Sequence, residues 1–321
     1  MAAVSDALLP EVVELPQVGL RELDPLLGEE IAVWKQRFAW DFRPSADLLR
    51  RFVQIHALYG YALRWRRELV GYAYFVVEGH KGLIGDFYVC SGHATHTNEA
   101  MLLGAVVQGL MLTSGVRRIE SQLMMLSSGL GQVPFQRFLT THDRLFMETP
   151  ASSASALIPR NGHTGAKFFS WEERFGEEVA HLVATAYRGH VDSEINDQYR
   201  TIPGARHFLN NIIRFPGCGI FSPGCSVVAM DNRTGRVCGV CLTSMVADNS
   251  GHVTQLCVLP AMRGSGVGYE LLRRALIRMA EAGCTIVSLT VTCSNLDAIR
   301  LYESVGFRSI SVFPALVWEG F

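Results

Sequence analysis

The chain has 321 residues, more than one ordinary domain of roughly 100–200 residues holds, so its length predicts two domains. Hydrophobic residues make up 49% and charged residues 18% of the chain, which indicates a folded protein and excludes an intrinsically disordered one. The formal net charge of −1 provides no broad positive field for a phosphate backbone, so no nucleic-acid partner is expected.

The sequence shows no sign of a membrane segment or an export signal. Its longest apolar stretch, residues 100–110, is far shorter than the roughly 20 residues that cross a bilayer. Residues 1–6 lack the basic patch and apolar run of a signal peptide. We therefore expect a cytoplasmic protein whose eight cysteines are free thiols.

The pair Cys238 and Cys241 has the C-x-x-C spacing of some metal and redox sites. It lies in a run that predicts a strand, where an odd separation directs two side chains to opposite faces. We interpret both as buried thiols and expect no metal site.

In chain order, the first half predicts two helices, three strands, a helix and a strand. The expected ranges are 26–38, 46–58, 59–65, 70–77, 82–89, 98–113 and 116–124. The second half predicts the same order of elements, with a hairpin across residues 231–235. Its expected ranges are 177–187, 205–213, 225–230, 236–246, 252–259, 268–282 and 285–292.

The two halves therefore predict a tandem repeat. Gly71 matches Gly239 and Gly115 matches Gly283, each pair separated by 168 positions. The fold class is α/β (α+β), with two units that each have a central mixed β-sheet flanked by helices. Residues 150–164, rich in small and turn-forming residues, predict a linker between domains 1–149 and 165–321.

A glycine-spaced turn follows the strand expected at 252–259 and opens the helix expected at 268–282. Arg263, Gly264, Gly266 and Gly268 occupy this turn. Glycines allow close approach of the backbone, and the N–H groups of a first helical turn favour a pyrophosphate. No Gly-Lys-Ser/Thr follows, and Tyr269 stands where a dinucleotide fingerprint beginning at Gly264 needs glycine, so both nucleotide motifs are excluded.

The spacing Arg-x-x-Gly-x-Gly at Arg263, Gly266 and Gly268 resembles the GNAT acetyltransferase superfamily. A second segment, residues 295–307, is similar to the superfamily pattern N-x-x-A-x-x-L-Y-x-x-x-G-F. The resemblance implies acetyl-CoA as acyl donor and an amine as acceptor. It implies that the backbone of Leu256 and Val258 pairs with pantetheine, and that Arg263, Gly264, Gly266 and Gly268 hold the phosphates.

Candidate residues for catalysis follow from the same comparison. Tyr302 is the expected general acid, because superfamily members carry a tyrosine in this Leu-Tyr pair. Asn295 is expected to contact the cofactor arm, to cap its own helix, or both. For the general base the alternatives are His252, the loop carboxylates of Asp192 and Glu194, and a water relay.

The first half departs from the pattern. Its corresponding loop, residues 90–98, contains one glycine, and residues 126–133 do not match the second segment. We expect a GNAT-like unit without the phosphate loop. The leading hypothesis is an N-acetyltransferase acting on a primary amine of a small molecule or protein, and the alternative is a non-catalytic acyl-CoA-binding regulatory or interaction module. The acceptor, the acyl length and the oligomeric state stay open.

Overall fold

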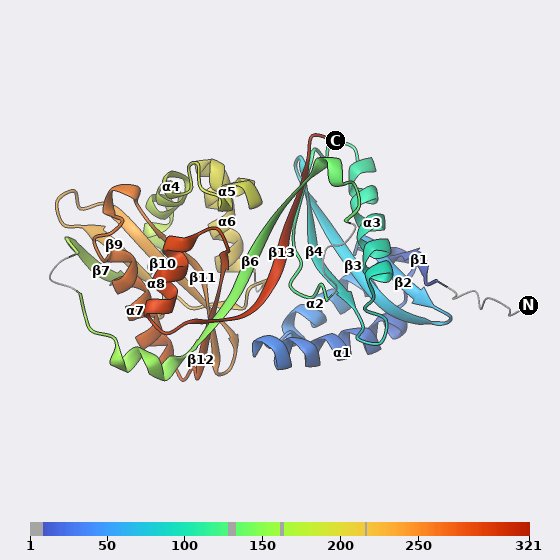
Figure 1. Cartoon of the computed structure of the whole chain (residues 1–321), viewed down its shortest axis with the longest axis horizontal. Helices are drawn as coiled ribbons and strands as arrows, with labels where there is room; N and C mark the ends of the chain where they lie inside the picture. Colours follow the sequence, from blue (N-terminus) through green and yellow to red (C-terminus); the bar gives the residue numbers. More distant parts are fainter. Residues whose placement is uncertain (1–8, 128–132, 161–163, 216) are drawn as a thin grey trace, which may run out of the picture. The chain divides into compact units, whose positions relative to one another are not determined.

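The computed structural model describes residues 9–127, 133–160, 164–215 and 217–321, and the chain divides into two compact units (Figure 1). Unit 1 comprises Met1–Arg37, Phe42–His142 and Phe313–Phe321. Unit 2 comprises Phe38–Asp41 and Asp143–Val312. The last nine residues therefore belong to unit 1, although the rest of the second half belongs to unit 2.

This division differs from the expected domains 1–149, 150–164 and 165–321. Residues 143–150 belong to unit 2 because they pair with a strand of that unit, from Arg144 opposite Thr292 to Pro150 opposite Ile286. The expected linker is a packed segment in its described part, because Ala151 and Ala154 are buried in the core of unit 2. Within the segment expected to be a linker, residues 151–156 form a short 3-10 helix, Ala151–Ala156, that packs on the helix Val267–Glu281.

Unit 1 contains a mixed sheet in the order β1-β2-β3-β4-β5-β13. Its strands are β1 (Glu11–Glu14), β2 (Gly60–Trp65), β3 (Glu68–Glu78), β4 (Lys81–Val89), β5 (Arg118–Gln122) and the end of β13 (Arg308–Glu319). Its helices are α1 (Leu20–Phe38), α2 (Arg43–Gln54) and α3 (His96–Leu112). The pairing of β4 with β5 is parallel and the pairing of β13 with β5 is antiparallel.

Unit 2 contains a mixed sheet in the order β6-β12-β11-β10-β9-β7, and β8 pairs with β10. Its strands are β6 (Leu139–Pro150), β7 (Ala166–Ser170), β8 (Ile220–Phe221), β9 (Val227–Asp231), β10 (Val237–Ala247), β11 (Ser250–Val258) and β12 (Ile286–Thr292). Its helices are α4 (Gly176–Ala186), α5 (Asp192–Ile195), α6 (Ile202–Arg214), α7 (Val267–Glu281) and α8 (Leu296–Ser304). Sequence patterns missed the strands β1, β6, β7, β8 and β13.

Corresponding positions in the two sheets confirm the repeat. Gly71 on β3 lies opposite Val89, the last residue of β4, and Gly239 on β10 lies opposite Val258, the last residue of β11. Gly115 and Gly283 follow α3 and α7 with φ of +87° and +94°, a conformation that favours glycine. Gly71 and Gly239 thus occupy corresponding strand positions in the two units, and Gly115 and Gly283 occupy corresponding turns after a helix.

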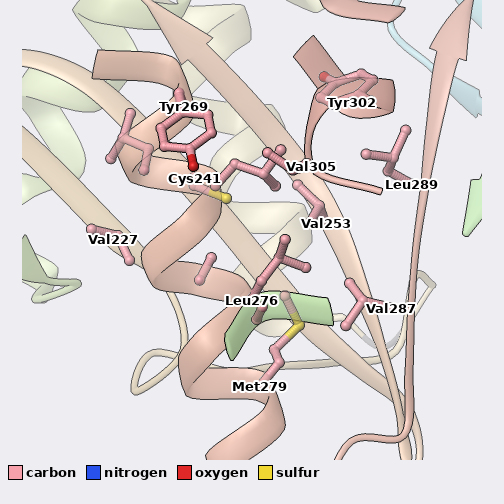
Figure 2. Packing of buried hydrophobic residues seen from close by; sticks show 14 of the residues in the cluster. Val227, Cys241, Val253, Tyr269, Leu276, Met279, Val287, Leu289, Tyr302 and Val305 are labelled. Atoms are coloured by element: carbon pink, nitrogen blue, oxygen red, sulfur yellow. The ribbon is translucent and has the colours of Figure 1, made fainter. Parts of the chain in front are cut away.

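Two apolar layers cover the sheet of unit 2. Helices α7 and α8 pack on one face through residues such as Leu276, Met279 and Val305 (Figure 2). Helices α4 and α6 pack through a separate cluster that includes Val183, Leu209 and Val240. The sheet is thus buried on both faces, and the polar groups described below lie where two of its strands separate.

Cys238 and Cys241 are buried in β10, as expected for apolar thiols. Both belong to the same core cluster, whereas opposite faces were expected; the strand register shifts between Val237 and Gly239, which breaks the simple alternation. Within the described ranges, no helix is long and apolar enough to span a bilayer.

Candidate active site

The strands β11 and β12 separate in the middle of the unit 2 sheet. Their parallel pairing runs from Ser250 opposite Ile286 to Val253 opposite Leu289, and no further pair joins them among the described residues. Strand β12 remains paired with β6 as far as Thr292. A cavity of about 620 Å³ lies at this separation and is lined by residues of both strands.

The hydrogen-bond alternation of β11 shows which backbone groups face the gap. The N–H of Leu259 donates to the oxygen of Cys238 at 2.8 Å, so Cys257 and Gln255 are the next residues directed toward β10. Leu256 and Val258, at the alternate positions, direct their N–H and C=O groups away from β10. These two residues were the ones expected to pair with an extended ligand, and both line the cavity.

The glycine turn forms one end of the cavity. Gly264 and Gly266 have φ of +76° and +87°, and Gly266 is the residue that precedes α7. A Cβ on Gly268 would lie 3.5 Å from Leu301 Cδ2 and 3.6 Å from Val258 Cγ2, which is ordinary contact. All three glycines line the cavity, so the N-terminus of α7, where the first N–H groups of a helix have no partner within the helix, borders the cavity.

Arginine side chains border this end of the cavity. Arg263 Nη2 donates to the main-chain oxygen of Ala186, at the end of α4, at 2.8 Å. The guanidinium carbon of Arg160 lies 4.1 Å from the centre of the Tyr269 ring, and the main-chain N–H of Arg160 donates to Glu270 Oε2 at 3.2 Å. Both arginines line the cavity, so positive charge surrounds the site at which the glycine backbone is exposed.

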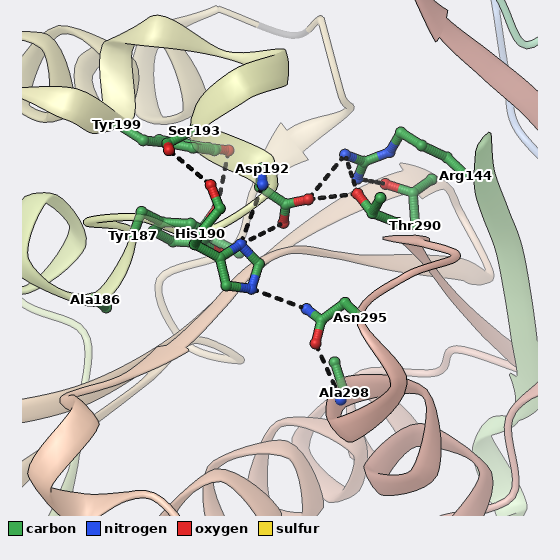
Figure 3. Close-up of polar contacts among 12 residues, drawn as sticks. Arg144, Ala186, Tyr187, His190, Asp192, Ser193, Tyr199, Thr290, Asn295 and Ala298 are labelled. Carbon is green, nitrogen blue, oxygen red and sulfur yellow. Dashed lines mark hydrogen bonds and ion pairs between the residues drawn. The ribbon is translucent and has the colours of Figure 1, made fainter. Parts of the chain in front are cut away.

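Asn295 lies between the helix α8 and the opposite wall. Its Oδ1 accepts a hydrogen bond from the N–H of Ala298 at 3.3 Å, which caps α8. Its Nδ2 lies 3.3 Å from Nε2 of His190, and the side chain lines the cavity (Figure 3). Asn295 therefore caps α8 and lines the cavity at the same time.

Tyr302 belongs to α8 and lines the cavity with 8% of its surface exposed. Burial, and secondarily the neighbouring Cys241 and Asp192, raise the pKa of its phenol above the ordinary value of 10. The hydroxyl therefore stays protonated across the ordinary pH range. This is the state that a proton donor requires.

His252 lies in a different place from the one expected for a general base. It is 4% exposed, its Nδ1 is 2.9 Å from Ser288 Oγ, and its ring packs against Trp40 at 4.9 Å. It is not among the described residues that line the cavity. Burial, with a smaller effect of Arg144, lowers its pKa to about 3, so the ring is neutral and a weak base. The structure thus corrects the interpretation of His252: its side chain is part of a buried aromatic cluster.

Tyr187 and Tyr199 form an aromatic wall of the cavity. Their rings stack with centres 4.5 Å apart, and both line the cavity. Gln255 Nε2 donates to the Tyr187 hydroxyl at 2.6 Å, and the Tyr199 hydroxyl donates to Gln255 Oε1 at 3.4 Å. The amide of Gln255 therefore positions both phenols.

Charged groups occupy the end of the cavity next to this wall (Figure 3). Asp192, at the start of α5, accepts a hydrogen bond from the Thr292 hydroxyl and lies 3.6 Å from Nη1 of Arg144 on β6. Its N–H donates to Nδ1 of His190 at 3.1 Å. Glu194, the second expected loop carboxylate, is not among the described lining residues.

Sequence patterns missed several residues of this site. Arg144 and Arg160 come from β6 and from the segment expected to be a linker, so no motif marked them. His190 precedes α5 by two positions and carried no recognisable spacing. Only the position of Asp192 between two expected helices had pointed to this region.

Unit 1 has a different arrangement at the corresponding turn. The N–H of Ser91, just after β4, donates to Glu29 Oε1 at 2.8 Å, and the Tyr88 hydroxyl donates to the same carboxylate at 2.9 Å. A carboxylate of the unit itself thus accepts a backbone N–H at this turn. The expectation that unit 1 lacks a phosphate site stays a prediction, and part of its second segment, residues 128–132, lies outside the described residues.

Comparisons with known proteins agree with this geometry. Residues 194–307 match the family described as acetyltransferase (GNAT) family. N-alpha-acetyltransferase MAK3 of Arabidopsis thaliana is 40% identical over 57 residues, which are 18% of this chain and 30% of that protein. The chain therefore covers less than a third of that relative.

Solved structures show the same fold over nearly the whole chain. A GCN5-related N-acetyltransferase from Sphaerobacter thermophilus superimposes with a TM-score of 0.66 at 15% identity, covering 97% of both chains. A tandem GNAT protein from the clavulanic acid biosynthesis pathway gives a TM-score of 0.56 at 14% identity, covering 97% of this chain and 98% of its own. The likeness shows the fold of GNAT proteins over nearly the whole chain, and residues 194–307 carry the match to the GNAT family of acetyltransferases.

Proposed function

We propose that the chain transfers an acetyl group from acetyl-CoA to a primary amine at the cavity of unit 2. The observation that carries this proposal is the presence, in one cavity, of two features: the end of β11, whose backbone pairs with β12 no further than Val253 in the described part of the chain, and a glycine turn at a helix N-terminus. The first suits the amides of pantetheine and the second suits a pyrophosphate. A ligand that carries both groups in this order is coenzyme A.

The donor is held along the strand. The backbone groups of Leu256 and Val258 pair with the pantetheine amides, and the N–H groups after Gly264, Gly266 and Gly268 receive the phosphates. Arg263 and Arg160 add positive charge at the same end, although Arg263 also holds the end of α4. The thioester then lies in the gap between β11 and β12, beside Tyr302.

The reaction requires a neutral amine and a proton for the departing thiolate. The amine nitrogen attacks the thioester carbonyl carbon, a C–N bond forms, and the C–S bond breaks. Tyr302 donates its proton to the sulfur, and the proton lost by the amine passes to a base. His190 and Asp192 line the acceptor end of the cavity and are the candidates for this base. The thiol of Cys257 also lines the cavity, but burial raises its pKa to about 12, so it stays protonated and does not accept the proton.

A non-catalytic acyl-CoA-binding module would bind the cofactor through the same strand backbone and glycine turn, but it would not need Tyr302 as a proton donor. Release of free thiol from acetyl-CoA in the presence of a panel of primary amines separates the two functions. We expect amine-dependent release by the native chain, and a decrease of roughly 100-fold or more in kcat for Tyr302→Phe with CoA affinity retained. CoA binding without turnover across the panel would contradict the enzyme and favour the binding module.

A further inference from the structure

We propose that the amine acceptor carries a carboxylate close to its reacting nitrogen, and that Arg144 binds this carboxylate. The inference rests on the proposed acetyl transfer and names the class of its acceptor. The acceptor is then an amino-acid-type zwitterion. A peptide N-terminus, whose amine is followed by a neutral amide, is disfavoured.

The first argument is the incomplete hydrogen bonding of Arg144. The residue lies on β6 opposite Thr292, is 9% exposed and lines the cavity. Its Nη1 donates to Thr292 Oγ1 at 3.4 Å and its Nη2 donates to Thr290 Oγ1 at 3.1 Å (Figure 3). Its Nε is buried and has no hydrogen-bond partner in the described part of the chain. A buried guanidinium with spare donors is costly, so a functional reason is expected.

The second argument is that Asp192 neutralises Arg144 only in part. A single contact of 3.6 Å joins Arg144 Nη1 to Asp192 Oδ1, and the same oxygen also accepts the Thr292 hydroxyl. The other oxygen, Oδ2, lies 3.9 Å from His190 Nδ1. The pair lacks the two parallel hydrogen bonds that arginine and carboxylate prefer. A second carboxylate, supplied by the acceptor, matches the planar fork of the guanidinium.

The third argument is the position of Arg144 relative to the reaction. Its two hydroxyl partners, Thr290 and Thr292, flank Val291, which lines the gap where the thioester lies in the proposed complex. Arg160 and Arg263, the other arginines among the described lining residues, border the glycine turn at the phosphate end. The cation near the acetyl group is therefore Arg144, while Asp192 lies beside it to attract the ammonium form of the same acceptor.

The test compares the common amino acids with their own carboxamides as acceptors for the full-length chain at saturating acetyl-CoA. We expect kcat/KM to be at least about tenfold higher for the free acids, with the difference mainly in KM. Arg144→Gln is expected to remove this preference and Arg144→Lys to restore part of it. The surface variant Arg233→Gln, at a residue whose side chain is 87% exposed in the β9–β10 hairpin, serves as the matched control and keeps the preference.

Calorimetric titration with CoA and thermal unfolding accompany every variant, so that a defect of the fold or of the donor site is recognised. Equal turnover of acids and carboxamides by the native chain, or an unchanged preference in folded Arg144→Gln, overturns the carboxylate proposal and leaves acetyl transfer standing. CoA binding without thiol release for any amine overturns acetyl transfer and the carboxylate proposal with it.

Discussion

The guanidinium of Arg263 donates a hydrogen bond to the main-chain oxygen of Ala186, with 2.8 Å between Nη2 and O. This bond ties the turn that precedes α7 to the last residue of α4, where helix carbonyls carry partial negative charge. One side chain thus connects the proposed phosphate site with the helix that leads to Tyr187 and the acceptor end.

We expect Arg263→Ala to weaken CoA binding by roughly 5- to 30-fold, because the variant loses both a cation near the phosphates and the bond that positions the turn. Arg263→Lys should retain part of the affinity through its charge. Calorimetric titration with CoA measures the effect, with Arg233→Ala as the exposed control. Unchanged affinity in Arg263→Ala would show that the residue contributes only to the fold.

Gly266→Val should abolish CoA binding. The residue has φ of +87°, which a β-branched side chain rarely adopts, and it borders the proposed pyrophosphate. Gly283→Val is the matched control, because Gly283 has φ of +94° at the other end of the same helix, away from the cavity lining. Both substitutions should cost about 1–2 kcal/mol of stability, and only the first should remove binding. Equal CoA affinity in the two folded variants would contradict the assignment of the glycine turn as the pyrophosphate site.

A buried carboxyl pair in unit 1 should make its stability depend on pH. Glu30 is fully buried, accepts hydrogen bonds from Trp34 Nε1 at 3.1 Å and the Tyr72 hydroxyl at 2.7 Å, and shares that hydroxyl with Asp86 at 2.9 Å. Burial, and then the charge of Asp86, raise the pKa of Glu30 well above 4.5. Burial also raises the pKa of Asp86 above 3.8.

Because the folded state holds its proton more tightly than the unfolded state, the stabilisation is present at low pH and is lost as the pH rises from about 4.5 through the raised pKa of Glu30. Glu30→Gln mimics the protonated form, so we expect a flatter dependence of the unfolding midpoint on pH and a gain relative to the native chain at pH 8. Thermal unfolding between pH 5 and pH 8 measures this. Glu22→Gln, at a more exposed carboxylate on the same helix, should leave the slope unchanged, and an unchanged slope in Glu30→Gln would refute the expectation.

The second half of the chain should not fold well by itself. A fragment covering Lys167–Phe321 lacks the β6 residues that pair with β12 over seven positions, from Arg144 to Pro150, and exposes that edge. We expect aggregation or a much lower unfolding temperature. The fragment Asp143–Val312 keeps the β6 residues that pair with β12 and omits residues 313–321, of which Ala315–Glu319 pair with β5. It should be the more soluble of the two, and a stable, fully active Lys167–Phe321 fragment would show that β6 is dispensable.

Local signals in the sequence were sufficient to predict the repeat and to name candidate residues at the glycine turn and on α8. Gly264 and Gly266 adopt positive φ, which the turn requires, and Asn295 and Tyr302 belong to the pattern of one short helix. Such features depend on residues close together in the chain, where φ preferences, caps and apolar periodicity act directly. For this reason Leu256, Val258, Arg263, Asn295 and Tyr302 could be named as candidates from the sequence, and all five line one cavity.

From the sequence alone one can predict the succession of helices and strands that the two halves share, and the glycine turn before α7. The tertiary structure alone decided that β6 joins the sheet of unit 2 while the end of β13 joins that of unit 1, that His252 is buried behind Trp40, and that Arg144 meets Thr292 from 148 positions away. Strand partners and ion pairs of this kind depend on which distant segments pack together. No local preference encodes that choice, because it follows from burying the edges and faces of the whole sheet.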